Sequence, residues 1–187
     1  MSTPETGAVG RIPSGSFREL GPINWVVAKL AARTVRAPEM HLFTTLGQRQ
    51  ALFWGWAIYN ARLLRGRLPS VDTELVILRV AHLRSSEYEL QHHRRLARKV
   101  GLDAQTQAEI FSWPDRSGKL SARQRALLAA TDEFVKDRTV TAATWQQLAS
   151  HLDRRQLIEF CLLASHYDGL AATMSALEIP LDHPRNP

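Results

Sequence analysis

The sequence predicts an all-α protein, and three observations support this fold class. Apolar residues recur at intervals of three and four along most of the chain, which is the period of an amphipathic helix. No segment alternates apolar and polar residues between turn signals, so we expect no β-sheet. Capping-box patterns at Ser121–Gln124 and Asp153–Gln156 mark two helix starts. These patterns together predict one bundle of about seven to eight helices.

The expected helices follow one another with short connections. The first is Ile23–Val35, which stops before Pro38 because the residue before a proline disfavours helical backbone. The second covers residues 38–65, with bends possible at Gly47 and Gly55. Gly and Pro residues or caps then delimit the remaining helices, which we expect at 70–85, 87–100, 104–111, 121–136, 141–152 and 153–177.

The composition is that of one ordinary globular domain. The chain has 187 residues, of which 44% are hydrophobic and 22% are charged, a balance that excludes disordered, collagen-like and coiled-coil classes. Residues 1–20 are rich in Gly and Pro and are expected to form a flexible arm. We expect the domain to cover residues 21–182, followed by a proline-containing tail at 183–187.

Charge, hydropathy and cysteine content indicate which partners and which cellular location to expect. The net charge of +6 is modest, and the densest basic cluster is explained by the solvated face of one helix, so we expect no nucleic-acid partner. No apolar run approaches a membrane span, and residues 1–10 lack a secretory pattern, so we expect no membrane partner. Cys161 is the only cysteine, which fits a cytoplasmic location.

Two consecutive predicted helices carry polar residues on apolar faces. The segment from Glu74 to Leu83 is apolar nearly all round, so Glu74 must be paired, hydrogen-bonded or protonated. In the next helix, Glu89 and His93 lie one turn apart on the apolar stripe, where their side chains can meet. A carboxylate that orients an imidazole in a partly dry interior is a candidate acid–base pair.

Two other interpretations of this pair stay open. Glu89 and His93 could form a satisfied polar contact without chemistry, or they could ligate a metal ion. Glu74, His82 and His92 are further potential ligands, but no familiar metal-binding spacing links them. We therefore expect neither a metal nor another cofactor.

These residues lie in a segment that resembles a known family. The sequence from Glu74 to His93, ELVILRVAHLRSSEYELQHH, is similar to the core of the carboxymuconolactone decarboxylase family, whose superfamily includes the alkylhydroperoxidase D (AhpD) proteins. Weaker similarity extends from about Asn24 to Asp182. The resemblance implies an AhpD-like helical bundle and a homo-oligomer, a trimer or a multiple of it, with a dimer possible.

The peroxidase branch of that superfamily uses a Cys-x-x-Cys pair, and this chain departs from it. The two cysteine positions correspond to Ser86 and Glu89, while the glutamate and the final histidine correspond to Glu74 and His93. Disulfide-based peroxide reduction needs two thiols. The resemblance therefore disfavours a thiol peroxidase and favours the decarboxylase branch.

The decarboxylase-like branch implies a cofactor-free lyase or isomerase acting on a small cyclic or carbonyl-containing acid. His93 would be the general acid–base group, Glu89 would orient it or shuttle a proton, and Glu74 would be a further carboxylate. The expected substrate-binding residues are Tyr88, Arg79, Arg84 and Ser86. Tyr88 could instead simply pack, and Arg79 could neutralise Glu74 or Glu89.

Other assignments also remain open from the sequence alone. His92 is expected to face solvent or a neighbouring subunit, and His166 and Tyr167 are expected to pack in the core or to close the pocket. A non-catalytic oligomeric protein that binds a small molecule would keep the same fold. A cyclase or dehydratase of secondary metabolism would need the same proton transfers as a decarboxylase.

The lack of paired thiols makes a direct prediction. The purified protein is expected to show no thiol-dependent turnover of peroxides in a peroxide-consumption assay, because one cysteine cannot complete a two-thiol cycle within a chain. Robust turnover that is lost in Cys161→Ser would contradict this exclusion.

Overall fold

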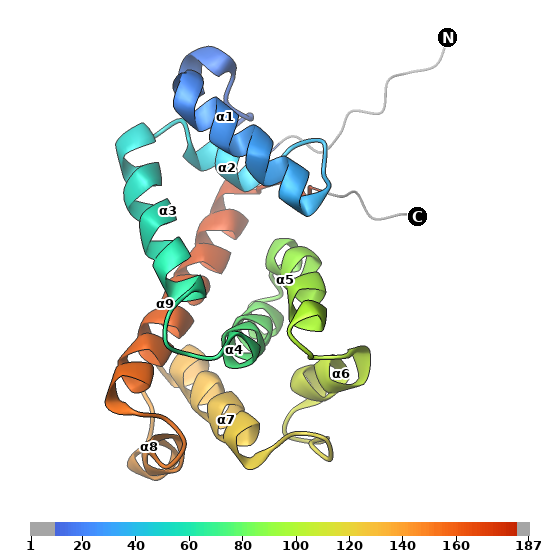
Figure 1. Cartoon of the computed structure of the whole chain (residues 1–187), viewed down its shortest axis with the longest axis vertical. Helices are drawn as coiled ribbons and strands as arrows, with labels where there is room; N and C mark the ends of the chain where they lie inside the picture. The colour runs from blue at the N-terminus through green and yellow to red at the C-terminus, as the bar shows by residue number, and fades with distance from the viewer. Residues whose placement is uncertain (1–9, 183–187) are drawn as a thin grey trace. The chain divides into compact units, whose positions relative to one another are not determined.

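The computed structural model describes residues 10–182, and this part of the chain contains nine α-helices and no strand (Figure 1). The all-α prediction is therefore confirmed. No helix in residues 10–182 has the length and apolar character needed to cross a membrane. The helices are α1 (Phe17–Val35), α2 (His41–Leu46), α3 (Gln50–Leu64), α4 (Ser70–Leu83), α5 (Glu87–Lys99), α6 (Ala104–Ser112), α7 (Ala122–Asp137), α8 (Ala142–Ala149) and α9 (Arg154–Leu177).

The described residues group into two compact units, one of residues 10–58 with 173–182 and one of residues 59–172. In the first unit α1 packs on α2. Ser16 and Glu19 form a capping box at the start of α1, so this helix begins inside the segment expected to be a flexible arm. Residues 1–9 of that arm and the tail at 183–187 lie outside the described residues.

The single helix predicted over residues 38–65 is wrong, because the chain turns between α2 and α3. The Asn24 side chain donates a hydrogen bond to the carbonyl oxygen of Gly47 at 2.9 Å. A continuous helix would use that carbonyl for the residue four positions later. A Cβ at Gly47 would also lie 2.7 Å from the Leu20 side chain. Contacts with α1 therefore end α2 at this point.

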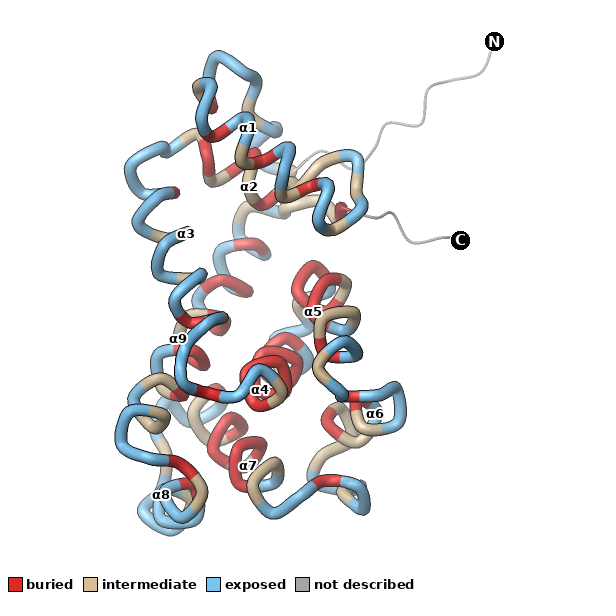
Figure 2. Tube along the Cα trace, viewed as in Figure 1, coloured by how far each residue is buried: buried red, intermediate tan, exposed pale blue. Residues whose placement is uncertain are grey.

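The second unit is built around α4, which packs against α5, α6 and α7 (Figure 1). Every residue from Asp72 to Ala81 is buried (Figure 2). This confirms the prediction of a helix that is covered on all sides. Ionised groups on α4 must consequently find partners on neighbouring helices, because an unpaired buried charge is unstable.

The loop from α3 to α4 is held by a carboxylate from α9. Glu159 accepts hydrogen bonds from the backbone N–H groups of Arg67 at 2.7 Å and Leu68 at 3.0 Å. A Cβ at Gly66 would lie only 2.0 Å from Glu159 Oε1. Any side chain at this position would therefore displace the carboxylate from its two donors.

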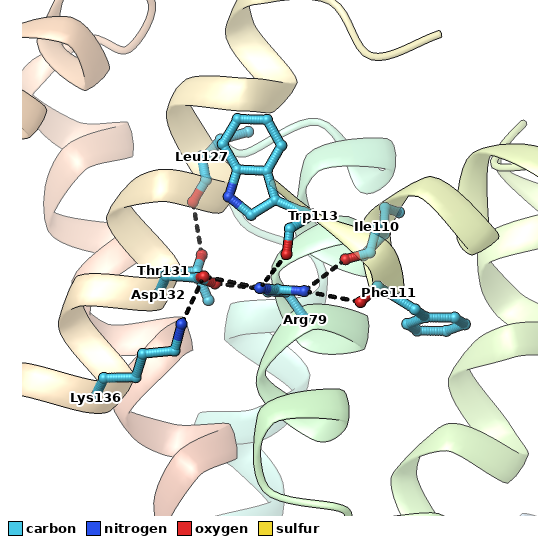
Figure 3. Close-up of polar contacts among 8 residues, drawn as sticks. All are labelled: Arg79, Ile110, Phe111, Trp113, Leu127, Thr131, Asp132 and Lys136. Carbon is cyan, nitrogen blue, oxygen red and sulfur yellow. Dashed lines mark hydrogen bonds and ion pairs between the residues drawn. The ribbon is translucent and has the colours of Figure 1, made fainter. Parts of the chain in front are cut away.

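The most extensively bonded charge on α4 is Arg79 (Figure 3). Its Nε and Nη2 atoms donate to the two carboxylate oxygens of Asp132 on α7, at 2.6 and 2.7 Å. Nη1 donates to the carbonyl oxygens of Ile110 and Phe111, and Nη2 donates to that of Trp113. All five N–H groups of the guanidinium are thus engaged, and they join α4 to α7 and to the end of α6.

This arrangement predicts a large stability loss for Asp132→Ala. The substitution leaves the buried Arg79 guanidinium without its counter-charge, which should lower the free energy of unfolding by about 3–5 kcal/mol. Urea denaturation measures the loss. Asp137→Ala is the matched control, since Asp137 is an exposed aspartate on the same helix, and its effect should stay within about 0.5 kcal/mol. Equal effects of the two variants would contradict a structural role for the Arg79–Asp132 pair.

Candidate acid–base site

A carboxylate and an imidazole meet where α4 packs on α5. Glu74 Oε2 lies 2.8 Å from Nδ1 of His93, and both side chains are buried. The carboxylate accepts the proton carried by Nδ1, which fixes the orientation of the ring and leaves Nε2 for a second partner. The expectation that Glu89 would orient His93 is therefore wrong, because Glu74 holds this position.

Glu89 lies on the same buried side of α5, and its carboxyl group is only 3% exposed. Neither of its oxygens forms a hydrogen bond of normal geometry with any part of the chain between residues 10 and 182. Burial raises the pKa of Glu89 to about 8; the nearby Ser86 hydroxyl lowers it in part, and the Asp168 carboxylate raises it further. Glu89 is consequently a neutral carboxylic acid at pH 7.

Tyr167 on α9 brings a phenol to these carboxyl groups. It is buried, and its ring meets the ring of His93 edge-on with the centroids 5.3 Å apart. Burial raises the pKa of Tyr167 well above its usual value, and the charges of Glu74 and Glu89 raise it further. The ring contact with His93 places the phenol beside the Glu74–His93 pair, and its raised pKa keeps it protonated. We name Glu74, Glu89, His93 and Tyr167 the acid–base cluster.

An amide from α3 borders the acid–base cluster. The hydroxyl of Tyr167 donates to Asn60 Oδ1 over 3.4 Å, and Nε2 of His166 lies 3.2 Å from the same oxygen. The sequence drew attention to His166 and Tyr167 without assigning them a role in the chemistry. The sequence analysis did not identify Asn60, because nothing in the surrounding sequence distinguishes it from a surface asparagine.

Three other residues of interest pack around α5. Ser86 is the residue that precedes the first turn of this helix, close to Glu89. Tyr88 is buried, and its ring centroid lies 5.0 Å from that of His92. His92 is itself only 7% exposed, so the expectation that it faces solvent or a neighbouring subunit is wrong.

Both arginines expected to hold a substrate carboxylate have partners within the chain. Arg79 uses all its donors on Asp132 and three carbonyl groups. It therefore neutralises neither Glu74 nor Glu89, which was the other interpretation. Arg84 is an exposed residue that forms an ion pair with Asp168 and donates to the carbonyl oxygen of Val135 at 2.6 Å. Internal acceptors thus use every donor of Arg79, whereas Arg84 is held at the surface by its ion pair.

Possible metal-binding groups and two surface cavities can be compared with the position of the acid–base cluster. In the described chain, no three or more His, Cys, Asp or Glu side chains converge in a way that suits a metal ion. One surface cavity of about 360 Å³ lies beside Trp113, Arg125 and His151, and another of about 130 Å³ lies in the first unit. Neither of these two cavities is lined by a residue of the acid–base cluster.

The buried acid predicts an unusual pH dependence for Glu89→Gln. Between the ordinary pKa of 4.5 and about 8, the unfolded wild-type chain loses a proton that the folded chain retains. Wild-type stability therefore falls as pH rises through this window and levels off above it. Glutamine resembles the neutral acid, so the variant should become more stable than wild type with rising pH, by on the order of 3 kcal/mol at the upper end.

Urea denaturation of both proteins across this pH range measures the effect. Glu87→Gln is the matched control, because Glu87 is an exposed glutamate of the same helix, and its difference from wild type should not change with pH in this way. Parallel pH curves for wild type and Glu89→Gln would show that Glu89 ionises normally.

Part of the chain, containing most of the acid–base cluster, is similar to a known family. Residues 50–133 match the sequence model of the carboxymuconolactone decarboxylase family, a segment that includes Glu74, Glu89 and His93. No curated protein matches the chain.

Several solved structures share the fold. A peroxidase-related protein with an alkylhydroperoxidase AhpD core, from Ralstonia eutropha, aligns with a TM-score of 0.81 at 15% identity over 95% of each chain. A peroxidase-related protein from Silicibacter gives a TM-score of 0.77 at 14% identity, covering 96% of this chain and 94% of the other. A variant of the debrominase Bmp8, in complex with 2,3,4-tribromopyrrole, gives 0.73 at 13% identity over 90% of each chain. The resemblance seen in the sequence is thus supported: the chain has the AhpD-like fold, and its residues 50–133 match the sequence model of the carboxymuconolactone decarboxylase family.

Proposed function

We propose that the protein is a cofactor-free acid–base catalyst, of the lyase or isomerase class, that acts on a small carbonyl-containing molecule. One observation carries the proposal: Glu89 is a buried, neutral acid whose oxygens form no hydrogen bond of normal geometry within residues 10–182, and it lies one helical turn before His93, which Glu74 holds. A buried carboxyl group without partners destabilises the fold. Groups with strongly shifted pKa values in such clusters are candidates for proton transfer.

The proposed chemistry is a concerted pair of proton transfers. Nε2 of His93 removes a proton from the carbon next to the substrate carbonyl, and the electrons of that C–H bond form the double bond of an enol. The carbonyl oxygen takes the proton of Glu89. Return of the His93 proton to a different carbon, and of the enol proton to Glu89, completes an isomerisation and restores both groups.

Glu74 acts through His93 in this scheme. Its hydrogen bond to Nδ1 holds the imidazole in the tautomer with a basic Nε2 and stabilises the imidazolium that forms. The phenol of Tyr167, kept protonated by its surroundings, is a second donor toward oxygen that becomes negative during the reaction. Loss of carbon dioxide, ring closure and dehydration would draw on the same groups, because each also passes through an enolate-like intermediate.

Thiol chemistry is not proposed, although two structural relatives are described as peroxidase-related. Cys161 lies on α9, and burial raises the pKa of its thiol. A thiol with a raised pKa is mostly protonated and is a poor nucleophile. The residues present thus support proton transfer better than disulfide exchange.

A non-catalytic binding protein is the second candidate, and the burial of the acid–base cluster favours it. Glu89 and His93 are only 3% and 8% exposed, so a substrate can reach them only if the surrounding side chains move. A binding protein would need no proton transfer. Variants that change turnover without changing ligand affinity therefore separate the two functions.

We also propose that the protein forms a homo-oligomer and acts in the cytoplasm. Large apolar side chains on α9, including Ile158 at 58% and Leu162 at 43% exposure, support an interface, since exposed apolar surface of this kind is often covered by a partner. The single cysteine supports the location.

The activity can be tested without knowing the physiological substrate. Small cyclic ketones and lactones are incubated with the protein in heavy water, and proton NMR follows the exchange of hydrogens next to the carbonyl. His93→Ala and Glu89→Gln should each slow this exchange by roughly 100-fold or more. The wild-type rate should fall as pH rises through about 8, because Glu89 then loses the proton it donates.

His151→Ala is the matched control, since His151 lies between α8 and α9, next to the larger surface cavity. Its exchange rate should equal that of wild type. Exchange that is the same in wild type, His93→Ala and Glu89→Gln would overturn the proposed function and leave the binding protein as the better candidate.

A further inference from the structure

We infer that the acid–base cluster takes an uncharged carbonyl compound, such as a ketone, an enone or a lactone without an ionised group, and discriminates against carboxylates. This inference rests on the proposed function and narrows its substrate class. It departs from the carboxylated substrate that the sequence resemblance implied.

The cation on α4 is directed away from the acid–base cluster. Arg79 is 3% exposed, and its guanidinium bonds Asp132 on α7 and carbonyl groups at the end of α6 (Figure 3). With all five of its donors used, it can bind a substrate carboxylate only by giving up Asp132. That exchange would leave one buried carboxylate unpaired for each one gained.

The cations at Asp168 are paired with that carboxylate. Arg84 pairs with Oδ1 of Asp168, and Arg138 pairs with Oδ2. Each oxygen of this carboxylate therefore already has a guanidinium partner. The negative charge of Asp168 also disfavours ionisation of Glu89.

The remaining groups of the acid–base cluster are neutral or acidic. Glu89 is an uncharged acid, Tyr167 is an uncharged phenol, and a positive charge on His93 would be balanced by Glu74 at 2.8 Å. The charges that act on Glu89 and Tyr167 from the described part of the chain come from carboxylates. A carbonyl oxygen, by contrast, would find O–H donors in Glu89 and Tyr167 without needing a counter-ion.

Within the proposed class, this charge distribution favours isomerisation or loss of water over loss of carbon dioxide. Decarboxylation begins from an ionised carboxylate, which must be bound and held by a cation or by several hydrogen-bond donors. A neutral substrate needs only the proton transfers already assigned to His93 and Glu89.

A matched pair of ligands tests the inference by binding alone. Levulinate and its methyl ester share a ketone and a carbon chain and differ in one negative charge. Each ligand is titrated into wild type and into His93→Ala, and ligand-observed NMR gives the dissociation constants. The difference between the two proteins is the part of the affinity that depends on the acid–base cluster. The ester should bind at least tenfold more tightly than the acid. Equal or tighter binding of levulinate, or binding of neither ligand, would overturn the inference.

A variant that frees two arginines should reverse the preference. Asp168→Asn removes the counter-charge of Arg84 and Arg138, so its affinity for levulinate should rise at least tenfold. Asp137→Asn, which makes the same charge change at an exposed position, should leave the affinity unchanged. No gain in a folded Asp168→Asn protein would contradict the role assigned to these pairs. The wild-type comparison stands even if this variant does not fold.

The outcomes also separate this inference from the proposed function. Preferential binding of the ester without His93-dependent hydrogen exchange would sustain the inference and refute the catalytic function. His93-dependent exchange that is equally fast for levulinate and its ester would sustain the catalytic function and refute the inference.

Discussion

Because α4 is buried along most of its length, each charge that it carries depends on a partner from another helix. Asp72 pairs with Arg123 on α7, Glu74 pairs with His93 on α5, and the third pair joins Arg79 to Asp132. These contacts fix the rotation of α4 about its own axis, since a small turn would separate all three pairs at once. The ion pairs that stabilise the second unit thereby also place Glu74 where it can orient an imidazole.

Glu89 on the neighbouring helix α5 is also buried, but it is not paired with a cation among the described residues. It has no cation and remains uncharged instead, at the cost of a raised pKa. Two carboxyl groups on neighbouring helices thus differ in their surroundings, since Glu74 accepts a hydrogen bond from His93 and Glu89 is left as a proton donor. Division of labour between neighbouring carboxyl groups is a recognised way to obtain both an acid and a base from similar side chains.

The sequence was sufficient for features that depend on nearby residues. The cap at Ser121 is confirmed, since its side chain accepts a hydrogen bond from the backbone N–H of Gln124. The burial of the helix from residue 70 is confirmed as well. Helix boundaries set by distant contacts were predicted only in part: a bend at Gly47 was expected as possible, but the break after α2 depends on a hydrogen bond from Asn24 to Gly47, a partner that no local pattern indicates.

The same limit explains the outcome for the candidate site. The spacing of residues within α5 correctly predicted that Glu89 and His93 are buried on one face. Such spacing identifies possible partners only within the same helix, so it could not identify a partner from α4. Glu74 lies 19 residues before His93 in the sequence. It is the hydrogen-bond partner of His93 because the packing of α4 on α5 brings its carboxylate next to the ring. The partners of Arg79 could not be predicted from the sequence either, because three of them are backbone carbonyl groups at the end of α6.

The contact of Glu159 with the loop before α4 has a consequence for synthesis on the ribosome. The two backbone donors of the loop precede that carboxylate by 92 and 91 residues, so the loop gains these bonds only after most of the polypeptide has left the exit tunnel. Until then the nascent α4 lacks its final anchor at Arg67 and Leu68, and its apolar surface is open to chaperones or to mispairing.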